Sequence, residues 1–323
     1  MPDAMNRPET PDVERLQAGL RTTLENHFGP GITVARRESH VHASTNALEI
    51  VTCRMVDGST VRIVCKYHPG WTHPSFGHRG GIPHEARMYR EVLQSLGTST
   101  PAFHGYHTDA EEKGWLCLEY VEVGMRLNMT PLPGALGQVG RWLGEFHAAA
   151  DKAFSRGAPA FLTRHDEAYY AGWAERAKLL ARMAEREFDW FDRLCDGFHD
   201  FASALLNAPA TCVHGEFYPH NILVAEKRIC PVDWESAALA AGEVDLASLT
   251  QGWPHEQVQS CEDAYQQARW PRGAPPGFER RIAAARAYWH LRWLGEKPSW
   301  ARRKEALVHF EHLQALGERW ELV

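Results

Sequence analysis

The sequence predicts an α+β protein with two lobes, a small sheet-based lobe followed by a mainly helical one. Residues 47–56 and 60–67 are both rich in β-branched side chains, and Asp57-Gly58-Ser59 between them is typical of a hairpin turn. After residues 131–133 (Pro-Leu-Pro), apolar side chains recur at helical spacing instead, as in residues 281–294. A short sheet followed by a long run of helices is the pattern of an α+β fold.

The sheet lobe is expected to begin with a helix. Thr10 is a suitable cap, Pro11 suits the first helical position, and apolar residues follow at helical spacing up to Phe28. Gly29-Pro30 ends this helix. A second helix is expected from Pro83 to Gly97, after the hairpin.

We expect three regions along the chain. Residues 1–12 are polar and predicted to be disordered, and residues 13–121 form an N-terminal nucleotide-binding lobe. Residues 122–323 form a C-terminal helical lobe with the catalytic loop and the acceptor pocket. Within it, residues 166–206 read as one long helical stretch with an aromatic stripe, which is usually core.

Composition restricts the function. The chain has 323 residues and a net charge of -6, without a dominant basic stripe, which argues against nucleic-acid binding. No run approaches the roughly 20 apolar residues of a membrane span. The seven cysteines contain no C-x-x-C pair and indicate scattered reduced thiols in a cytoplasmic protein, with Cys65, Cys212 and Cys230 in the core.

The chemistry is concentrated between residues 213 and 235. Glu216 precedes Asn221 by five residues, and Asp233 follows Asn221 by twelve, each beside a short apolar run of strand type. Phosphoryl transfer from a magnesium nucleotide needs one carboxylate to orient the attacking hydroxyl. It also needs an amide oxygen and a second carboxylate to hold the metal. These residue types therefore indicate a phosphotransferase site, with Glu216 catalytic and with Asn221 and Asp233 as Mg²⁺ ligands.

This segment resembles the catalytic loop of the aminoglycoside phosphotransferase and choline kinase family, which has a protein-kinase-like fold. The family carries His-Gly-Asp, four residues, Asn, and then a strand that ends in Asp. His214, Gly215, Asn221 and Asp233 match this pattern, whereas Glu216 stands where the family has the catalytic Asp. The resemblance implies a small-molecule kinase that uses Mg²⁺ and ATP or GTP.

A kinase also needs a strand lysine paired with a helix glutamate. Lys66 lies near the end of the second hairpin strand, and Glu85 lies in the first turn of the following helix, so we expect these two to pair. For the phosphates, backbone amides and the hydroxyls of Ser44 and Thr45 are candidates, although an ordinary surface turn is an open alternative.

In the resembled family, an apolar strand such as residues 115–121 links the two lobes, and its backbone binds the adenine. Glu119 and Val121 are the cofactor-binding candidates in this segment. Their side chains need not contribute, because backbone groups would read the base.

The residues of this site favour one function over two alternatives. The leading interpretation is transfer of the γ-phosphate to a hydroxyl of a small molecule, either an aminoglycoside-like or nucleoside antibiotic, an amino alcohol or a sugar. A nucleotide-binding pseudokinase with a regulatory role is the alternative, and Glu216 is the argument for it. A protein kinase is disfavoured because Trp234-Glu235, and not Phe-Gly, follows Asp233.

Other polar residues are interpreted as structural. His147 lies on an apolar helix face, and we expect a hydrogen-bonded core residue. Asp245 either braces the catalytic loop, as the resemblance implies, or caps the next helix. A segment that contains glycines and prolines carries four histidines, namely His68, His73, His78 and His84. Their spacing fits no zinc-ligand pattern, so a solvated loop is expected.

Overall fold

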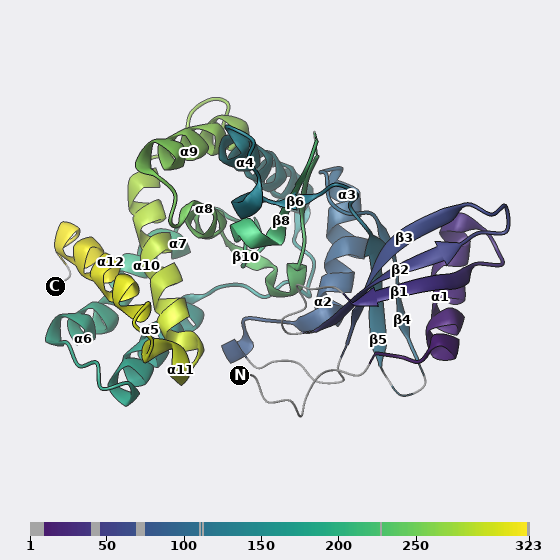
Figure 1. Ribbon diagram of the computed structural model, residues 1–323. Coiled ribbons are helices and arrows are strands. Elements are labelled where there is room, and N and C mark those ends of the chain that lie inside the picture. Colours follow the sequence, from purple (N-terminus) through teal and green to yellow (C-terminus); the bar gives the residue numbers. More distant parts are fainter. Residues whose placement is uncertain are drawn as a thin grey trace. The chain divides into compact units, whose positions relative to one another are not determined.

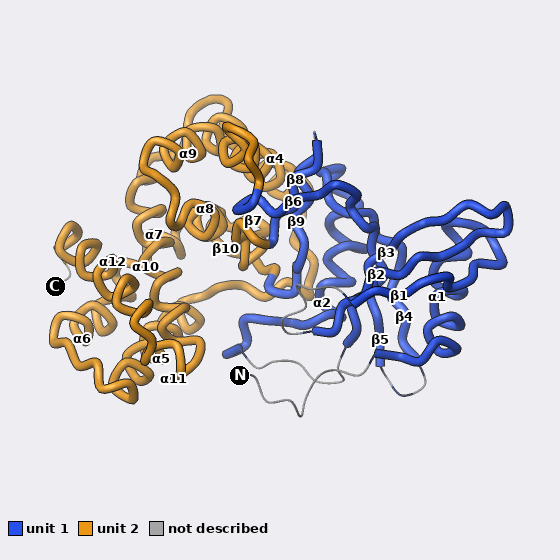
Figure 2. Tube along the Cα trace, viewed as in Figure 1, with its two compact units in different colours: residues 1–129, 221–236 blue, residues 130–220, 237–323 orange. Residues whose placement is uncertain are grey.

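The computed structural model describes residues 10–39, 46–68, 75–109, 111, 113–226 and 228–321 (Figure 1). It confirms the α+β class, with a small antiparallel sheet towards the N-terminus and a mainly helical C-terminal part. The chain divides into two compact units (Figure 2). Unit 1 comprises residues 1–129 and 221–236, and unit 2 comprises residues 130–220 and 237–323.

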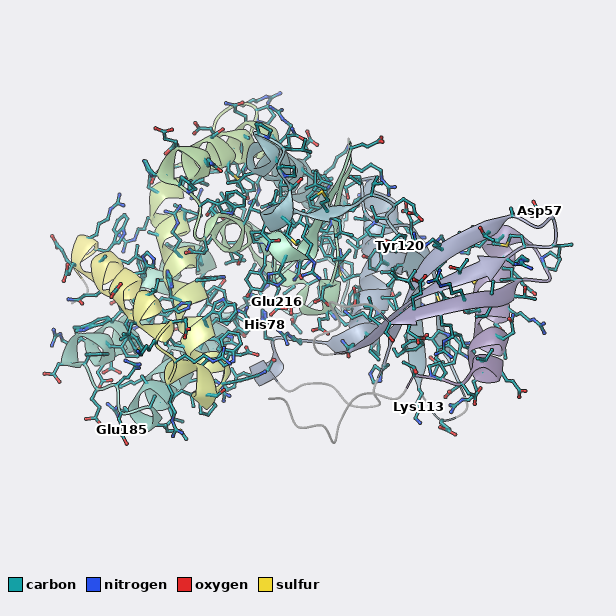
Figure 3. All side chains as sticks on the ribbon, viewed as in Figure 1. Asp57, His78, Lys113, Tyr120, Glu185 and Glu216 are labelled. Carbon is teal, nitrogen blue, oxygen red and sulfur yellow. The ribbon has the colours of Figure 1, made fainter. Side chains whose placement is uncertain are left out.

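Unit 1 is built on an antiparallel sheet of five strands in the order β1-β2-β3-β5-β4. The strands are β1 (Thr33–Ser39), β2 (Ala47–Arg54), β3 (Thr60–Tyr67), β4 (Phe103–Thr108) and β5 (Gly114–Glu119). β2 and β3 form the expected hairpin, in which Arg54 pairs with Thr60. Asp57 lies at its turn (Figure 3) and accepts a hydrogen bond from the Ser59 amide at 2.9 Å. A short side chain that bonds the backbone two residues on stabilises such a turn.

Helix α1 (Val13–Phe28) buries Leu16, Leu20 and Leu24 in one core cluster with residues of the sheet. The expected start at Pro11 with a Thr10 cap is wrong. The Asp12 carboxylate is the cap, and it accepts the Arg15 amide at 2.8 Å. This carboxylate binds an otherwise unpaired amide of the first turn and carries the charge that the helix N-terminus favours. The helix ends before Gly29, as expected.

The second helix of unit 1 begins earlier than expected and is not uniform. α2 (Gly81–Arg87) starts two residues before Pro83, so the proline occupies the first turn, where no amide is needed. It continues through a π-helical segment (Met88–Leu93) into α3 (Gln94–Leu96). Gly97 ends it in the left-handed conformation, with φ of 66°.

A second, three-stranded sheet of unit 1 has the order β6-β8-β9. β8 (Ile222–Ala225) and β9 (Arg228–Pro231) form a tight hairpin, and β6 (Met125–Arg126) pairs with β8. The hairpin is remote in sequence from the rest of unit 1. Its inclusion brings Asn221 and Asp233 into the same compact unit as Lys66 and Glu85.

Unit 2 is mainly helical. Its helices are α4 (Ala135–Ala153), α5 (Glu167–Met183), α6 (Asp189–Asp196), α7 (Phe198–Leu206), α8 (Glu243–Thr250), α9 (His255–Arg269), α10 (Phe278–Glu296), α11 (Pro298–Ala301) and α12 (Ala306–Arg319). A two-stranded ladder joins β7 (Ala210–Val213) to β10 (Ala238–Ala241). Residues 166–206, expected to be one helical stretch, form three helices, α5 to α7. α10 packs against α5, α7, α8 and α12, so it is buried on most of its surface.

The seven cysteines are all free and buried, which confirms the core assignment of Cys65, Cys212 and Cys230. Burial raises the pKa of the Cys53 thiol to about 12 and that of Cys230 to about 11, so these thiols stay protonated at neutral pH. Across the described ranges, no helix combines the length and the apolar composition that a membrane crossing requires.

Candidate functional site

Lys66 is the central cation of unit 1. It is the penultimate residue of β3, and its Nζ lies 2.6 Å from Glu85 Oε2 of α2. The same Nζ also donates a short hydrogen bond to Asp233 Oδ1. The structure thus brings Lys66 and Glu85 together and adds a second carboxylate to the lysine.

Burial and charge oppose each other at this cluster. Burial alone would lower the pKa of Lys66, but the carboxylates of Asp233, Glu85 and Glu235 outweigh it and raise the pKa well above its usual range. Burial raises the pKa of Glu85, while Lys66 opposes that rise. Lys66 is therefore a permanent cation, held ready for an anionic ligand.

The β8–β9 hairpin explains why Asn221 and Asp233 belong to the same site. Asn221 immediately precedes β8 and Asp233 follows β9 by two residues, so both flank the open end of one hairpin. The Val232 amide donates to the Asn221 carbonyl at 2.9 Å and extends the pairing beyond the strands. Strand pairing, and not sequence proximity, therefore brings these two residues together.

The backbone at Asp233 is unusual. Its φ is 72°, a left-handed conformation that is costly for most residues with a side chain but tolerated by Asp and Asn. The next amide, that of Trp234, donates to Glu85 Oε1 at 3.3 Å. Glu85 therefore contacts both Lys66 and the segment that carries Asp233, and fixes where the chain turns.

Glu235 is a member of this cluster to which the sequence analysis assigned no role. It is buried, its Oε1 lies 3.5 Å from Arg79 Nε, and its carbonyl accepts the Gly80 amide at 2.8 Å. Burial, and then the charge of Asp233, raise the pKa of Glu235 to about 7. In the sequence, the only indication of a role for Glu235 was its position two residues after Asp233. Its burial depends on tertiary contacts, which the sequence pattern does not reveal.

The donor set fits a hard divalent cation. Asn221 offers an amide oxygen, and the Asp233 carboxylate keeps about a third of its side-chain surface exposed beside the fixed charge of Lys66. Oxygen ligands from one or two carboxylates, with the rest supplied by water and phosphate, are what Mg²⁺ prefers. Asn221 and Asp233 can therefore hold a magnesium nucleotide.

In unit 2, the loop after β7 is fixed by Asp245. The amides of His214 and Gly215 donate to the two carboxylate oxygens of Asp245, at 2.7 and 2.9 Å. Gly215 has a φ of 82°, which explains the glycine at this position. Asp245 lies within the first turn of α8, and Gly242 is the residue at the cap. Bracing of the loop is thus confirmed and the helix-cap alternative is wrong.

His147 supports this brace. It is fully buried, and its two ring nitrogens lie 3.4 Å from Asp245 Oδ2 and 3.0 Å from the Tyr265 hydroxyl. Burial lowers the pKa of His147, so the ring is neutral. The expectation of a hydrogen-bonded core histidine is confirmed.

Glu216 follows the braced segment and is buried within unit 2. Its Oε1 lies 3.3 Å from Nη1 of Arg292, a buried arginine of α10 that the sequence analysis did not single out. Tyr169 and Tyr288 were also missed. Their hydroxyls lie 2.7 Å apart, and burial, with a small contribution from the charge of Glu216, raises the pKa of Tyr169 to about 12. Both phenols remain neutral hydrogen-bonding groups near Glu216.

The segment expected to bind the adenine gives a mixed picture. The Glu119 side chain is engaged in unit 1, where it pairs with Arg228 at 2.7 Å and accepts the Ala102 amide at 2.9 Å. Val121 is buried, and its carbonyl accepts the Gly124 amide at 3.3 Å. Base recognition by backbone groups at Glu119 and Val121 stays a prediction.

Several predicted features fall outside this geometry. Ser44, Thr45 and His73 lie outside the described residues. The expectation of a solvated histidine loop is wrong for His78, which is buried, and His84 belongs to α2 and not to a loop. Within the described part of this segment, the burial of His78 and the start of α2 at Gly81 replace the expected loop.

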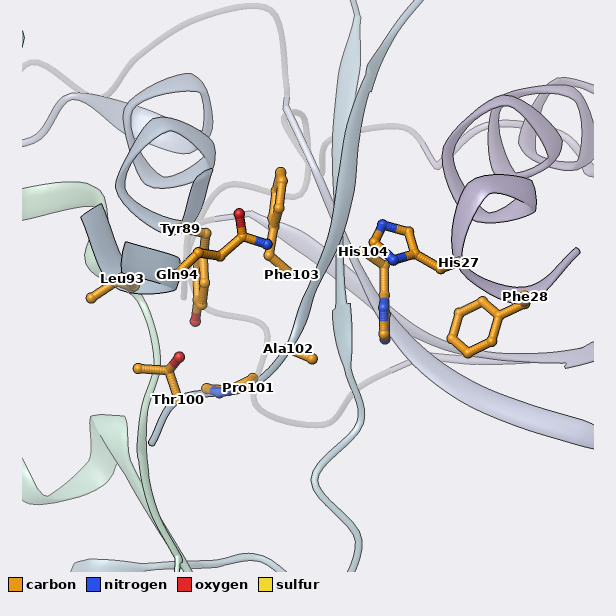
Figure 4. Close-up of a pocket in the computed structure, with 10 residues that line it drawn as sticks. All are labelled: His27, Phe28, Tyr89, Leu93, Gln94, Thr100, Pro101, Ala102, Phe103 and His104. Carbon is orange, nitrogen blue, oxygen red and sulfur yellow. The ribbon is translucent and has the colours of Figure 1, made fainter. Parts of the chain in front are cut away.

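A cavity of about 420 Å³ in unit 1 is separate from these residues (Figure 4). Phe103 and His104 are consecutive in β4, and their rings point to opposite sides of the strand. The cavity is lined by residues without a permanent charge, since only its two histidines can titrate near neutral pH. The lining residues are His27, Phe28, Tyr89, Leu93, Gln94, Thr100, Pro101, Ala102, Phe103 and His104. A cavity without a fixed cation is unsuited to phosphates, so it is not the candidate site.

A strand lysine held by a helix glutamate, a loop braced by Asp245 and a hairpin flanked by Asn221 and Asp233 are features of phosphotransferases with a protein-kinase-like fold. The model of the phosphotransferase enzyme family matches residues 55–281, more than half of the chain. The protein belongs to this family. No curated protein sequence matches the chain.

Solved structures agree with this fold. A choline kinase from Cryptosporidium parvum is 14% identical, with a TM-score of 0.63 over 95% of this chain and 96% of that one. A choline/ethanolamine kinase family protein from Mesorhizobium loti is 18% identical, with a TM-score of 0.58 and 88% of each chain covered. The GDP complex of an aminoglycoside 2'-phosphotransferase-IIIa mutant is 13% identical, with a TM-score of 0.60 over 95% and 98% of the two chains. At such identities the likeness establishes the fold alone.

Proposed function

We propose that this protein transfers the γ-phosphate of a magnesium nucleoside triphosphate, ATP or GTP, to a hydroxyl group of a small molecule. The observation that carries the proposal is the buried Lys66 amine between the carboxylates of Glu85 and Asp233. Phosphoryl transfer in kinases needs a strand lysine paired with a helix glutamate and an aspartate that binds the metal, and Lys66 lies against a candidate for each.

The residues of unit 1 bind and orient the nucleotide. Lys66 neutralises the phosphates while Glu85 holds its amine, and Asn221 and Asp233 hold Mg²⁺. A Mg²⁺ ion held there would supply positive charge against the phosphates during transfer. The backbone at Glu119 and Val121 binds the base.

Glu216 acts on the acceptor. Its carboxylate accepts a hydrogen bond from the acceptor hydroxyl and aligns it with the γ-phosphorus. The new bond forms between the hydroxyl oxygen and phosphorus as the bond from phosphorus to the leaving oxygen of the nucleoside diphosphate breaks. The hydroxyl proton passes to Glu216 late, because a loose transition state depends more on alignment than on a strong base.

The acceptor is proposed to be an aminoglycoside-like or nucleoside antibiotic, an amino alcohol or a sugar. Choline and an aminoglycoside appear in the names of the similar structures, which supports acceptors of this size. We place the reaction in the cytoplasm, where the seven free cysteines would stay reduced.

A pseudokinase remains the second candidate, since the ion pair between Glu216 and Arg292 could equally hold an inert loop. One experiment separates the two functions. Release of nucleoside diphosphate is measured with ATP or GTP, Mg²⁺ and a panel of hydroxyl compounds, and mass spectrometry identifies the phosphorylated product. Turnover that requires one acceptor class and is lost in Asp233→Asn supports the kinase. Tight nucleotide binding without turnover on any acceptor would overturn it.

A further inference from the structure

The buried arginine beside the catalytic carboxylate has no role in the reaction described so far. Arg292 lies on α10 and Glu216 follows β7, and their side chains are only 5% and 4% exposed. Nη1 of Arg292 is 3.3 Å from Glu216 Oε1 and 3.6 Å from Oε2 of Glu296, one helical turn further along α10. Two buried carboxylates therefore share one buried guanidinium.

Stability alone does not account for this triad. Burial removes water from all three charges, and the attraction regained at separations of 3.3 and 3.6 Å offsets only part of that cost. Elsewhere on α10, Arg281 pairs with Glu243 at 2.6 Å, which is a tighter arrangement. The pair of Arg292 with Glu216 is longer, at 3.3 Å, and we interpret it as a contact that orients the Glu216 carboxylate.

Arg292 also contacts the loop that carries Glu216. Its guanidinium lies 5.7 Å from the ring centroid of Tyr218, and the Tyr218 amide donates to the Glu216 carbonyl at 2.7 Å. Glu296 holds the same guanidinium from the opposite end of the turn. Arg292 is thus held by Glu296 of its own helix. It contacts the side chain of Glu216 and the ring of Tyr218, whose amide is hydrogen-bonded to the Glu216 carbonyl.

A glutamate has one more rotatable bond than an aspartate, so a carboxylate that must align a hydroxyl needs an additional restraint. We propose that Arg292 is the positioning residue that supplies this restraint and makes glutamate competent at position 216. Its contact with Oε1 limits the rotation of the Glu216 side chain. The shorter arm of an aspartate would not reach Arg292. This inference rests on the proposed kinase function.

The test is a double-mutant cycle on the full-length protein, with magnesium ATP or GTP and whichever acceptor the panel experiment identifies. Arg292→Met should lower kcat by about tenfold or more with little change in the KM for nucleotide, because alignment and not binding is lost. Arg292→Lys, which keeps the cation, should recover part of that loss. In a Glu216→Asp background, Arg292→Met should cost less than about threefold, since the contact is already broken.

Arg286→Met is the matched control, because Arg286 lies on the same helix and pairs with Glu262 of α9, away from Glu216. It should leave kcat unchanged, and circular dichroism verifies the fold of each variant. If Arg292→Met does not fold, the cycle is run with Arg292→Lys and the same non-additivity is expected. Wild-type kcat in Arg292→Met, or losses that multiply fully with Glu216→Asp, would overturn the positioning role. Absence of turnover in the wild type would instead overturn the proposed function, and this inference with it.

Discussion

The amine of Lys66 contacts Glu85 and Asp233, two carboxylates that lie 19 and 167 residues away in the sequence. We propose that each contact serves a different step of the reaction. Glu85 is buried and stays with the lysine, whereas Asp233 is partly exposed and can turn to a metal when a nucleotide binds. Lys66 can then exchange one carboxylate for phosphate oxygens without losing its other partner.

Lys66→Ala is expected to lower kcat/KM while the protein still folds, because phosphate neutralisation is lost. Glu85→Ala should lower it as well, but the double variant should lose little more than the worse single one, since both act through one amine. Steady-state kinetics on the three variants measure this coupling. Losses that multiply in the double variant would show that Lys66 and Glu85 do not act as a pair.

Asp233→Ala should abolish turnover together with the Mg²⁺-dependent stabilisation of the protein by nucleotide. An alanine at this position offers no oxygen ligand to the metal. Thermal shift with and without Mg²⁺ measures binding separately from catalysis. Asn221→Ala should act in the same direction but less severely, with a raised Mg²⁺ requirement. A wild-type Mg²⁺ response in Asp233→Ala would refute the metal assignment.

Glu216→Gln keeps the shape of the side chain but cannot accept a proton, and it should cost about 10²-fold or more in turnover. Nucleotide affinity should be unchanged, because the proposed phosphate and metal ligands all belong to unit 1. Glu216→Asp should keep part of the activity, limited by its reach. An aspartate variant that gains an activity absent from the native protein would favour the pseudokinase.

At the scale of elements, α4 and α9 approach each other through glycines. A Cβ on Gly140 would lie 2.6 Å from the Cys261 carbonyl oxygen, and one on Gly144 would lie 2.5 Å from that of Tyr265. Backbone atoms cannot yield at such distances. Because α4 also carries His147, which contacts Asp245, this close packing helps to support the catalytic loop.

Gly140→Ala is therefore expected to destabilise the protein by about 1–3 kcal/mol, through overpacking between α4 and α9. Gly137→Ala on the same helix is the control, because its Cβ would lie an ordinary 3.7 Å from Ser260 Oγ. That change should stabilise the helix by about 0.5–1 kcal/mol. Urea unfolding of both variants gives the comparison, and equal stability of the two would exclude tight packing at Gly140.

At the scale of the whole molecule, buried neutral histidines limit stability in acid. Burial lowers the pKa of His165 in unit 2 to about 3, and its ring stacks on Tyr169 with 3.8 Å between centroids. In unit 1, burial and then the charge of His27 lower the pKa of His104 to about 4. Each ring binds a proton more readily when the protein is unfolded, where its pKa is about 6.5.

A lowered native pKa means that the unfolded state binds more protons below about pH 6.5. The free energy of unfolding should therefore fall from about pH 6.5 towards pH 3, and be fully retained above that window. His165→Phe keeps the stacked ring and cannot titrate, so its stability should depend less on pH across this range. Urea unfolding followed by circular dichroism at pH 7, 6 and 5 measures the slope. An unchanged slope in His165→Phe would show that this ring does not contribute.

Local patterns were sufficient for the hairpin of β2 and β3, for the phosphotransferase loop and for the pairing of Lys66 with Glu85. Each depends on side chains close in sequence or on a spacing that few other chemistries need. The starts of the helices were predicted less accurately. α1 is capped by Asp12 and not by Thr10, and α2 begins at Gly81, two residues before the expected Pro83. The spacing of apolar residues does not reveal either of these starts.

By itself, the sequence determined the fold class, the loop carrying His214, Gly215 and Glu216, and the proposed oxygen ligands Asn221 and Asp233, because these follow from periodicity, residue type and a recognisable family pattern. Tertiary structure decided which charges meet in the interior. Asp233 on Lys66, Asp245 on the loop amides and Arg292 on Glu216 are contacts across 30 to 167 residues. Their energies depend on burial and distance, and neither quantity exists until the chain has folded.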